Sequence, residues 1–121
     1  MFHVTEAENV ASILRDGLTP QIGDRSRELG ETLPAVYAFP TAQACHDALM
    51  NWLGEWHEEQ EDRTGKTVEL AIIAFDPSGL AQAEQEVDWE ARFVEPIPAG
   101  AFRAIFSEKL FGEWFYRQAA A

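Results

Sequence analysis

Cysteine is nearly absent from this chain of 121 residues, which contains Cys45 alone. A single thiol excludes an intramolecular disulfide and a thiolate metal cluster, and it suits a reducing compartment. The sequence also lacks any apolar run close to the ~18 residues of a membrane span. At its start there is no basic segment followed by an apolar run, as a signal peptide would have. We therefore expect a cytoplasmic protein that does not interact with membranes.

Basic residues are scarce as well. Nine Lys and Arg stand against 21 Asp and Glu, and the formal net charge is -12. An acidic surface repels the phosphate backbone, which argues against nonspecific nucleic-acid binding. Such a chain can still hold a small anionic ligand through local arginines, or present an acidic face to a basic partner.

What the chain does have is enough apolar material for one core. Its length is that of one domain, residues 1–121. The apolar fraction is 46%, with eight Phe and four Trp. Large aromatic side chains bury the most apolar area per residue, so we expect most of them inside.

The first 20 residues contain the most clearly specified local structure. Phe2–Val4 is predicted to be a strand. Thr5 and Glu8 have the spacing of a capping box, which predicts a helix that starts after Thr5. Gly17 is placed for a left-handed C-terminal cap, with Leu18 packing back on the helix. The apolar stripe of this helix is Val10, Ile13 and Leu14.

The rest of the chain alternates strands and helices. A polar connection from Thr19 to Pro34 leads to a strand over 35–39, and Thr41 is placed to cap one long helix that ends in the acidic run 55–62. Residues 67–75 predict a central strand, and 76–79 predict a turn. From 84 to 93, acids alternate with apolar or small residues, which predicts a strand with an acidic face. A last strand over 102–106 and a terminal helix complete an α+β domain. Ser107 is placed to cap this helix, and its core-facing residues are expected to be Leu110, Phe111, Trp114 and Phe115.

Several common catalytic patterns are missing. No serine has the Gly-x-Ser-x-Gly context of a hydrolase, and no glycine loop precedes a Lys-Ser or Lys-Thr pair. His46 and His57 are three helical turns apart, too far to share one metal ion. No second ligand accompanies His3, so we expect no metal site.

The assembled pattern resembles the ADP-ribosyltransferase-fold family. The resemblance rests on His3-Val4-Thr5, on the helix ending in Gly17-Leu18, on Tyr37 in Val36–Pro40, and on residues 90–98. In the branch with a His-Tyr-Glu triad, three strands each provide one residue to an NAD site. The family fold is a single domain with a mixed or antiparallel split sheet flanked by helices.

The resemblance implies roles for individual residues. His3 would contact a ribose hydroxyl of NAD, Thr5 would belong to the same NAD-binding strand, and Tyr37 would stack on nicotinamide. Glu90 is the candidate catalytic acid, because 90–98 is similar to the strand that carries it. Glu95, Asp88 and Glu86 remain alternatives for this acid.

The pyrophosphate of NAD needs local positive charge in an acidic protein. Arg25 and Arg27 form a basic pair in the connection after the first helix, so we expect them to bind phosphate through forked hydrogen bonds. A solvated loop is the simpler alternative for this pair.

The leading expectation is an NAD-dependent transferase of ADP-ribose to a macromolecule, toxin-like and of bacterial or phage type by resemblance. A non-enzymatic alternative is an acidic interaction module that binds a basic protein partner through 55–62 and 84–90. RNA 2′-phosphotransferase chemistry, also found in this fold, ranks last because it needs a basic RNA-binding surface.

Overall fold

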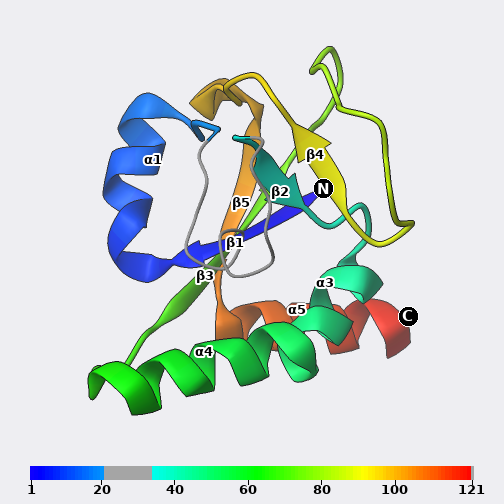
Figure 1. The fold of residues 1–121 in the computed structure, drawn as a ribbon. Helices are drawn as coiled ribbons and strands as arrows, with labels where there is room; N and C mark the ends of the chain where they lie inside the picture. Colours follow the sequence, from blue (N-terminus) through cyan, green and yellow to red (C-terminus); the bar gives the residue numbers. More distant parts are fainter. Residues whose placement is uncertain (21–33, 121) are drawn as a thin grey trace.

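The computed structural model describes residues 1–20 and 34–120, which form two antiparallel sheets with helices around them (Figure 1). The larger sheet has the order β1-β3-β5, and the smaller sheet pairs β2 with β4. The predicted α+β class with a split antiparallel sheet is confirmed. The strands are β1 (Phe2–Glu6), β2 (Val36–Ala38), β3 (Leu70–Phe75), β4 (Ala91–Phe93) and β5 (Phe102–Ser107).

Helices cover both sides of this arrangement. In Figure 1, α3, α4 and α5 run below the sheets, while α1 lies to one side of them. The α3 helix contacts both α4 and α5. The α-helices are α1 (Val10–Asp16), α3 (Ala42–Met50), α4 (Trp52–Thr64) and α5 (Glu108–Ala120), and the short 3-10 turns are η1 (Ala7–Asn9) and η2 (Ala99–Ala101).

The central strand β3 separates two hydrophobic clusters. Successive side chains of a strand point to opposite faces, so Ile72 joins one cluster and Ile73 the other, and both are fully buried. The Ile72 cluster includes Cys45 and Phe111 from the helices. The Ile73 cluster includes Phe93 from the small sheet. The central strand β3 is therefore buried on both faces, as its continuous apolar sequence predicts, whereas β5 exposes every second residue.

The N-terminal strand is longer than predicted, and the capping box does not form. Thr5 lies inside β1, where it is opposite Ala71. The first turn is η1, its N-terminal residue is Glu6, and no side chain caps it. Pairing with β3 continues to Glu6 and so takes Thr5 into the sheet, which a local motif cannot foresee.

The predicted single helix after Thr41 is two helices, α3 and α4. Thr41 caps α3 as expected, because its Oγ1 accepts a hydrogen bond from the amide of Ala44 at 3.1 Å. The break lies at Asn51, whose φ of -124° and ψ of -110° are not helical. The first turn of α4 then folds back so closely that a Cβ on Gly54 would overlap the carbonyl oxygen of Leu49. A glycine at 54 therefore permits this sharp turn.

Residues 84–90 are not the strand that their alternation predicts. Only Ala91–Phe93 form β4, and 84–90 are turns and isolated bridges. Trp89, expected on a buried face, is 44% exposed. A segment with alternating residues forms a strand only where a partner strand pairs with it. The partner here is β2, which spans only Val36–Ala38 and is too short to pair with 84–90.

The predicted cap at Ser107 and the predicted turn over 76–79 are confirmed, whereas Leu14 and Leu110 are not buried as predicted. Ser107 accepts a hydrogen bond from the amide of Leu110 at the start of α5, 3.2 Å away. Asp76 Oδ1 accepts one from the amide of Ser78 in the 76–79 turn, 2.9 Å away. Leu14 and Leu110 are 51% and 53% exposed. Both leucines lie at the edge of the apolar face of their helix, so the buried part of each face is narrower than the sequence predicts.

Candidate functional site

The two sheets meet where β1 passes β2. Phe2 and Phe39 exchange main-chain hydrogen bonds, N to O, of 3.0 and 2.7 Å. This antiparallel bridge sets His3 beside Tyr37, although 34 positions separate them in the sequence. The Nδ1 atom of His3 lies 2.7 Å from the carbonyl oxygen of Tyr37. Two of the residues predicted for the NAD site are therefore in direct contact.

This contact fixes the tautomer of His3. A carbonyl oxygen only accepts, so Nδ1 carries the proton and donates it. Burial lowers the pKa of His3 from its ordinary value near 6.5, and the bond to Tyr37 opposes that shift. A lowered pKa keeps the ring neutral at pH ~7. The neutral ring then has an unprotonated Nε2, a nitrogen that is able to accept a hydrogen bond.

A cavity of about 340 Å³ adjoins His3. The described residues give it a polar lining of an imidazole, hydroxyls, an amide and the carboxylate of Asp16, which is the charged group among them. Within the described part of the chain no Lys or Arg lines it. Groups of this kind suit a polyhydroxyl ligand such as a ribose. The polar residues that line it are His3, Thr5, Asn9, Ser12, Asp16 and Thr19.

The far wall of the cavity depends on Gly17. Its φ of +79° lies in the region that favours glycine, and its amide donates to Ile13 at 2.7 Å to end α1. Leu18 then pairs with Ile97 through two main-chain bonds of 2.9 Å each. A Cβ on Gly17 would lie 2.5 Å from the carbonyl oxygen of Ile97. The predicted glycine cap is confirmed, although its ψ of -174° is extended rather than left-handed helical.

The structure does not bring Tyr37 and Glu90 to the cavity in the way that it brings His3. Among the described residues neither belongs to its lining. Tyr37 reaches it through the main-chain bond to His3, and it lies opposite Arg92 in the small sheet. Glu90 immediately precedes β4, and its amide is 3.5 Å from the carbonyl oxygen of Val87. Glu90 therefore sits at the end of the strand paired with the Tyr37 strand.

The alternatives to Glu90 have different surroundings. Glu86 Oε1 is 3.2 Å from a guanidinium nitrogen of Arg92, and the Glu86 side chain is 74% exposed. The carbonyl of Asp88 accepts from the side-chain amide of Gln85 at 3.1 Å. Glu95 lies beyond β4 and is exposed. Arg25 and Arg27 lie outside the described residues.

Sequence reasoning did not select Asn9, Ser12 and Asp16, which line the cavity from the α1 side. Their spacing of three and four places them on one face of a helical segment. That polar stripe beside His3 was a usable signal. The apolar residues of the same segment define only its buried face and carry no information on this polar one.

Metal and membrane features are not found in the parts of the chain that the structure covers. Among those residues, no group of three or more His, Cys, Asp or Glu side chains is arranged to hold a metal ion. No described helix has the length and apolar character needed to cross a bilayer.

Comparison with known proteins finds no match for this chain. Neither a protein family, nor a curated protein, nor a solved structure matches this chain.

Proposed function

We propose that this protein binds NAD at the cavity beside His3 and transfers ADP-ribose to a macromolecular acceptor, with release of nicotinamide. The observation that carries the proposal is the hydrogen bond from His3 Nδ1 to the Tyr37 carbonyl. It joins two residues of the proposed triad across two strands. It also leaves the Nε2 of His3 as an acceptor at a cavity lined by polar, mostly uncharged groups.

The chemistry of the reaction suits this arrangement. Breaking the nicotinamide–ribose bond develops positive charge on the ribose, as in glycoside cleavage. A fixed ring that accepts a hydrogen bond from a ribose hydroxyl holds the sugar in one orientation. A carboxylate near the same sugar stabilises the charge as it forms. We propose Glu90 for this second role on the resemblance of 90–98 alone, since Glu90 does not belong to the described lining of the cavity. We also propose that the protein acts in the cytoplasm.

The pyrophosphate is the part of NAD that the described lining of the cavity does not suit. Asp16 places a carboxylate at the cavity, and no described cation lines it. The proposal therefore puts a ribose, not a phosphate, in the cavity, and it keeps Arg25 and Arg27 as the phosphate ligands.

The test measures NAD binding and turnover separately. NAD at millimolar concentration should raise the melting temperature, and free nicotinamide should appear with time. His3→Ala should weaken both, whereas Glu90→Gln should retain binding and lose nicotinamide release. Glu59→Gln, which changes an exposed acid on α4, serves as the control and should match the parent. Absence of any NAD-dependent shift in melting temperature would refute the proposal.

The position of the catalytic acid needs its own comparison. Glu86→Gln, Asp88→Asn and Glu95→Gln should each keep nicotinamide release close to that of the parent. If one of them loses release while Glu90→Gln retains it, the acid is that residue and the assignment to Glu90 is wrong.

A further inference from the structure

Helices α3 and α5 contact each other (Figure 1), and a groove of about 650 Å³ lies between them. The buried side chains of Leu49 from α3 and Phe111 from α5 line this α3–α5 groove. His46 of α3 stacks on Phe115 of α5, with the ring centroids 4.1 Å apart. Packing between the two helices therefore fixes the shape of the groove.

Large apolar side chains at the α3–α5 groove are exposed to water. Met50 and Tyr116 both line it, and they are 67% and 60% exposed. Gly112 lines it as well, and a Cβ built at Gly112 would have nothing within 4 Å. Without a side chain at this position, another helix is able to approach α5 closely. Exposed apolar surface of this kind is typical of a site that another polypeptide covers.

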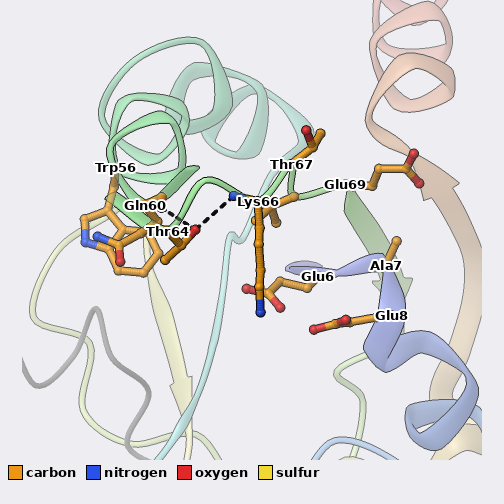
Figure 2. A pocket seen from close by; sticks show the side chains of 10 residues that line it. Glu6, Ala7, Glu8, Trp56, Gln60, Thr64, Lys66, Thr67 and Glu69 are labelled. Carbon is orange, nitrogen blue, oxygen red and sulfur yellow. Dashed lines mark hydrogen bonds between the residues drawn. The ribbon is translucent and has the colours of Figure 1, made fainter. Parts of the chain in front are cut away.

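The hollow between α4 and the β1–η1 junction has a different lining (Figure 2). Its volume is about 700 Å³, and charged side chains line it. In Figure 2 the side chain of Lys66 lies beside that of Glu6. Covering this hollow would take charged groups out of water, which costs free energy. Covering the α3–α5 groove removes mainly apolar surface from water, which is favourable, so the groove is the better docking surface.

Two opposite charges stand at the edge of the α3–α5 groove. Lys109 and Glu113 both line it, and their spacing of four places them in one row along α5, beside the row of Gly112 and Tyr116. Neither charge forms an ion pair with another described residue. When two α5 helices cross antiparallel at Gly112 about a twofold axis, the charged rows of both lie on the same flank. At a rise of about 1.5 Å per residue, Lys109 of one helix and Glu113 of the other then differ by only about 3 Å along the axis.

We propose that the α3–α5 groove binds a second copy of this chain, with the two α5 helices antiparallel. The order of the charges selects this orientation, because an antiparallel pair forms the contact between Lys109 and Glu113 twice, once on each side of the twofold axis. A parallel pair would place the two charged rows on opposite flanks. Met50 and Tyr116 of each copy are covered in the antiparallel pair.

The net charge of -12 opposes association of two copies. At ~0.15 M salt, however, charges more than about 8 Å apart are largely screened, whereas the pairs in contact keep most of their attraction. Among the described residues, none that lines the α3–α5 groove also lines the cavity beside His3. The interface between copies and the proposed NAD site are therefore separate surfaces.

The test measures self-association of the whole chain by sedimentation equilibrium at ~0.15 M salt. The parent should pass from monomer to dimer between about 1 and 500 µM, the range of weak homodimers. Met50→Gln keeps the length of the side chain and makes its end polar, so it should raise the dissociation constant about tenfold. The matched control is Leu110→Gln, because Leu110 is 53% exposed on α5 and lies outside the described lining of the groove. It should change the dissociation constant by no more than about twofold.

Charge reversals test the antiparallel pairing, with circular dichroism reporting the fold. Glu113→Lys puts a second ammonium beside Lys109 of the other copy, so it should weaken the dimer about three- to tenfold. This change replaces one negative charge by one positive charge and so takes the net charge from -12 to -10. Adding Lys109→Glu returns the net charge to -12 and restores opposite charges, so affinity should recover to within about twofold of the parent.

Three results would overturn the proposal. A parent that stays monomeric over the whole range has no such interface, and equal losses in Met50→Gln and Leu110→Gln would place the interface elsewhere. A tighter dimer in Glu113→Lys would mean that net charge alone governs association. These measurements need no NAD, so their failure and the failure of the transferase proposal are distinguishable.

Discussion

His3 and Tyr37 are joined by a 2.7 Å hydrogen bond from an imidazole Nδ1 to a main-chain carbonyl oxygen. The bond spans the junction between the two sheets. It depends on the Phe2–Phe39 bridge, which sets the register of β1 against β2. The ring of His3 is therefore held by a main-chain group, so the pairing of the strands fixes its orientation.

The stability of the protein should depend on pH through His3. Its pKa in the folded state is lowered from about 6.5 by burial, so the unfolded chain binds the proton more readily. The unfolding free energy of the parent should then fall as pH drops below ~6.5, by up to about 1.4 kcal/mol per unit of pKa difference. In His3→Gln this part of the pH dependence disappears. Urea titrations of both proteins between about pH 7.5 and 5.5 measure it.

The comparison uses the slope of the unfolding free energy against pH in each protein. His3→Gln also alters the bond to Tyr37, which changes the unfolding free energy by the same amount at every pH. The unfolding free energy of the parent minus that of the variant should therefore decrease as the pH falls. A difference that stays constant across this range contradicts the lowered pKa.

Replacing Gly17 by alanine should destabilise the fold strongly. The new Cβ would meet the carbonyl oxygen of Ile97 at 2.5 Å, at a φ of +79° that L-residues rarely adopt. Strain of this kind costs about 1–3 kcal/mol, and close packing against main chain adds to it. We expect a loss of about 2–4 kcal/mol in urea unfolding. The Leu18–Ile97 bridge should weaken with it.

Gly112→Ala provides the matched control for that substitution. Gly112 lies in α5, and nothing lies within 4 Å of a Cβ built there. Alanine is favoured over glycine within a helix by about 0.5–1 kcal/mol, so this variant should be as stable as the parent or slightly more so. If both alanine variants lose similar stability, the contact with Ile97 is not the cause.

Cys45 should resist modification until the protein unfolds. Its side chain is completely buried in the cluster of Ile72 and Phe111, and burial raises the pKa of the thiol to about 12. Thiolate is the reactive form, so iodoacetamide at about pH 8 should label the native protein very slowly and the urea-unfolded protein at once. Mass spectrometry across a urea series should show labelling that follows the unfolding transition. Rapid labelling without denaturant would show that Cys45 is accessible in the native state.

The sequence was most informative where local chemistry decides the structure. Thr41 and Ser107 cap their helices because a hydroxyl at that position meets an unpaired amide whatever the rest of the chain does. The apolar run Leu70–Phe75 favours a buried strand, and Gly17 after an apolar stripe favours the end of a helix; both predictions are confirmed. These features follow from the preferences of single residues and their immediate neighbours. The α+β class followed from their order along the chain.

The tertiary structure determined the strand pairings and side-chain contacts that join residues far apart in the sequence. Thr5 pairs with Ala71 of β3 and so does not cap the helix as its spacing predicts. The acids of 84–90 have no strand opposite them because β2 is only three residues long. The contact between His3 and Tyr37 and the cavity beside His3 likewise come from segments that meet only in space. The sequence pointed to His3 and Tyr37 by resemblance. Their distance and the tautomer of the ring came from the register between sheets, which no local pattern encodes.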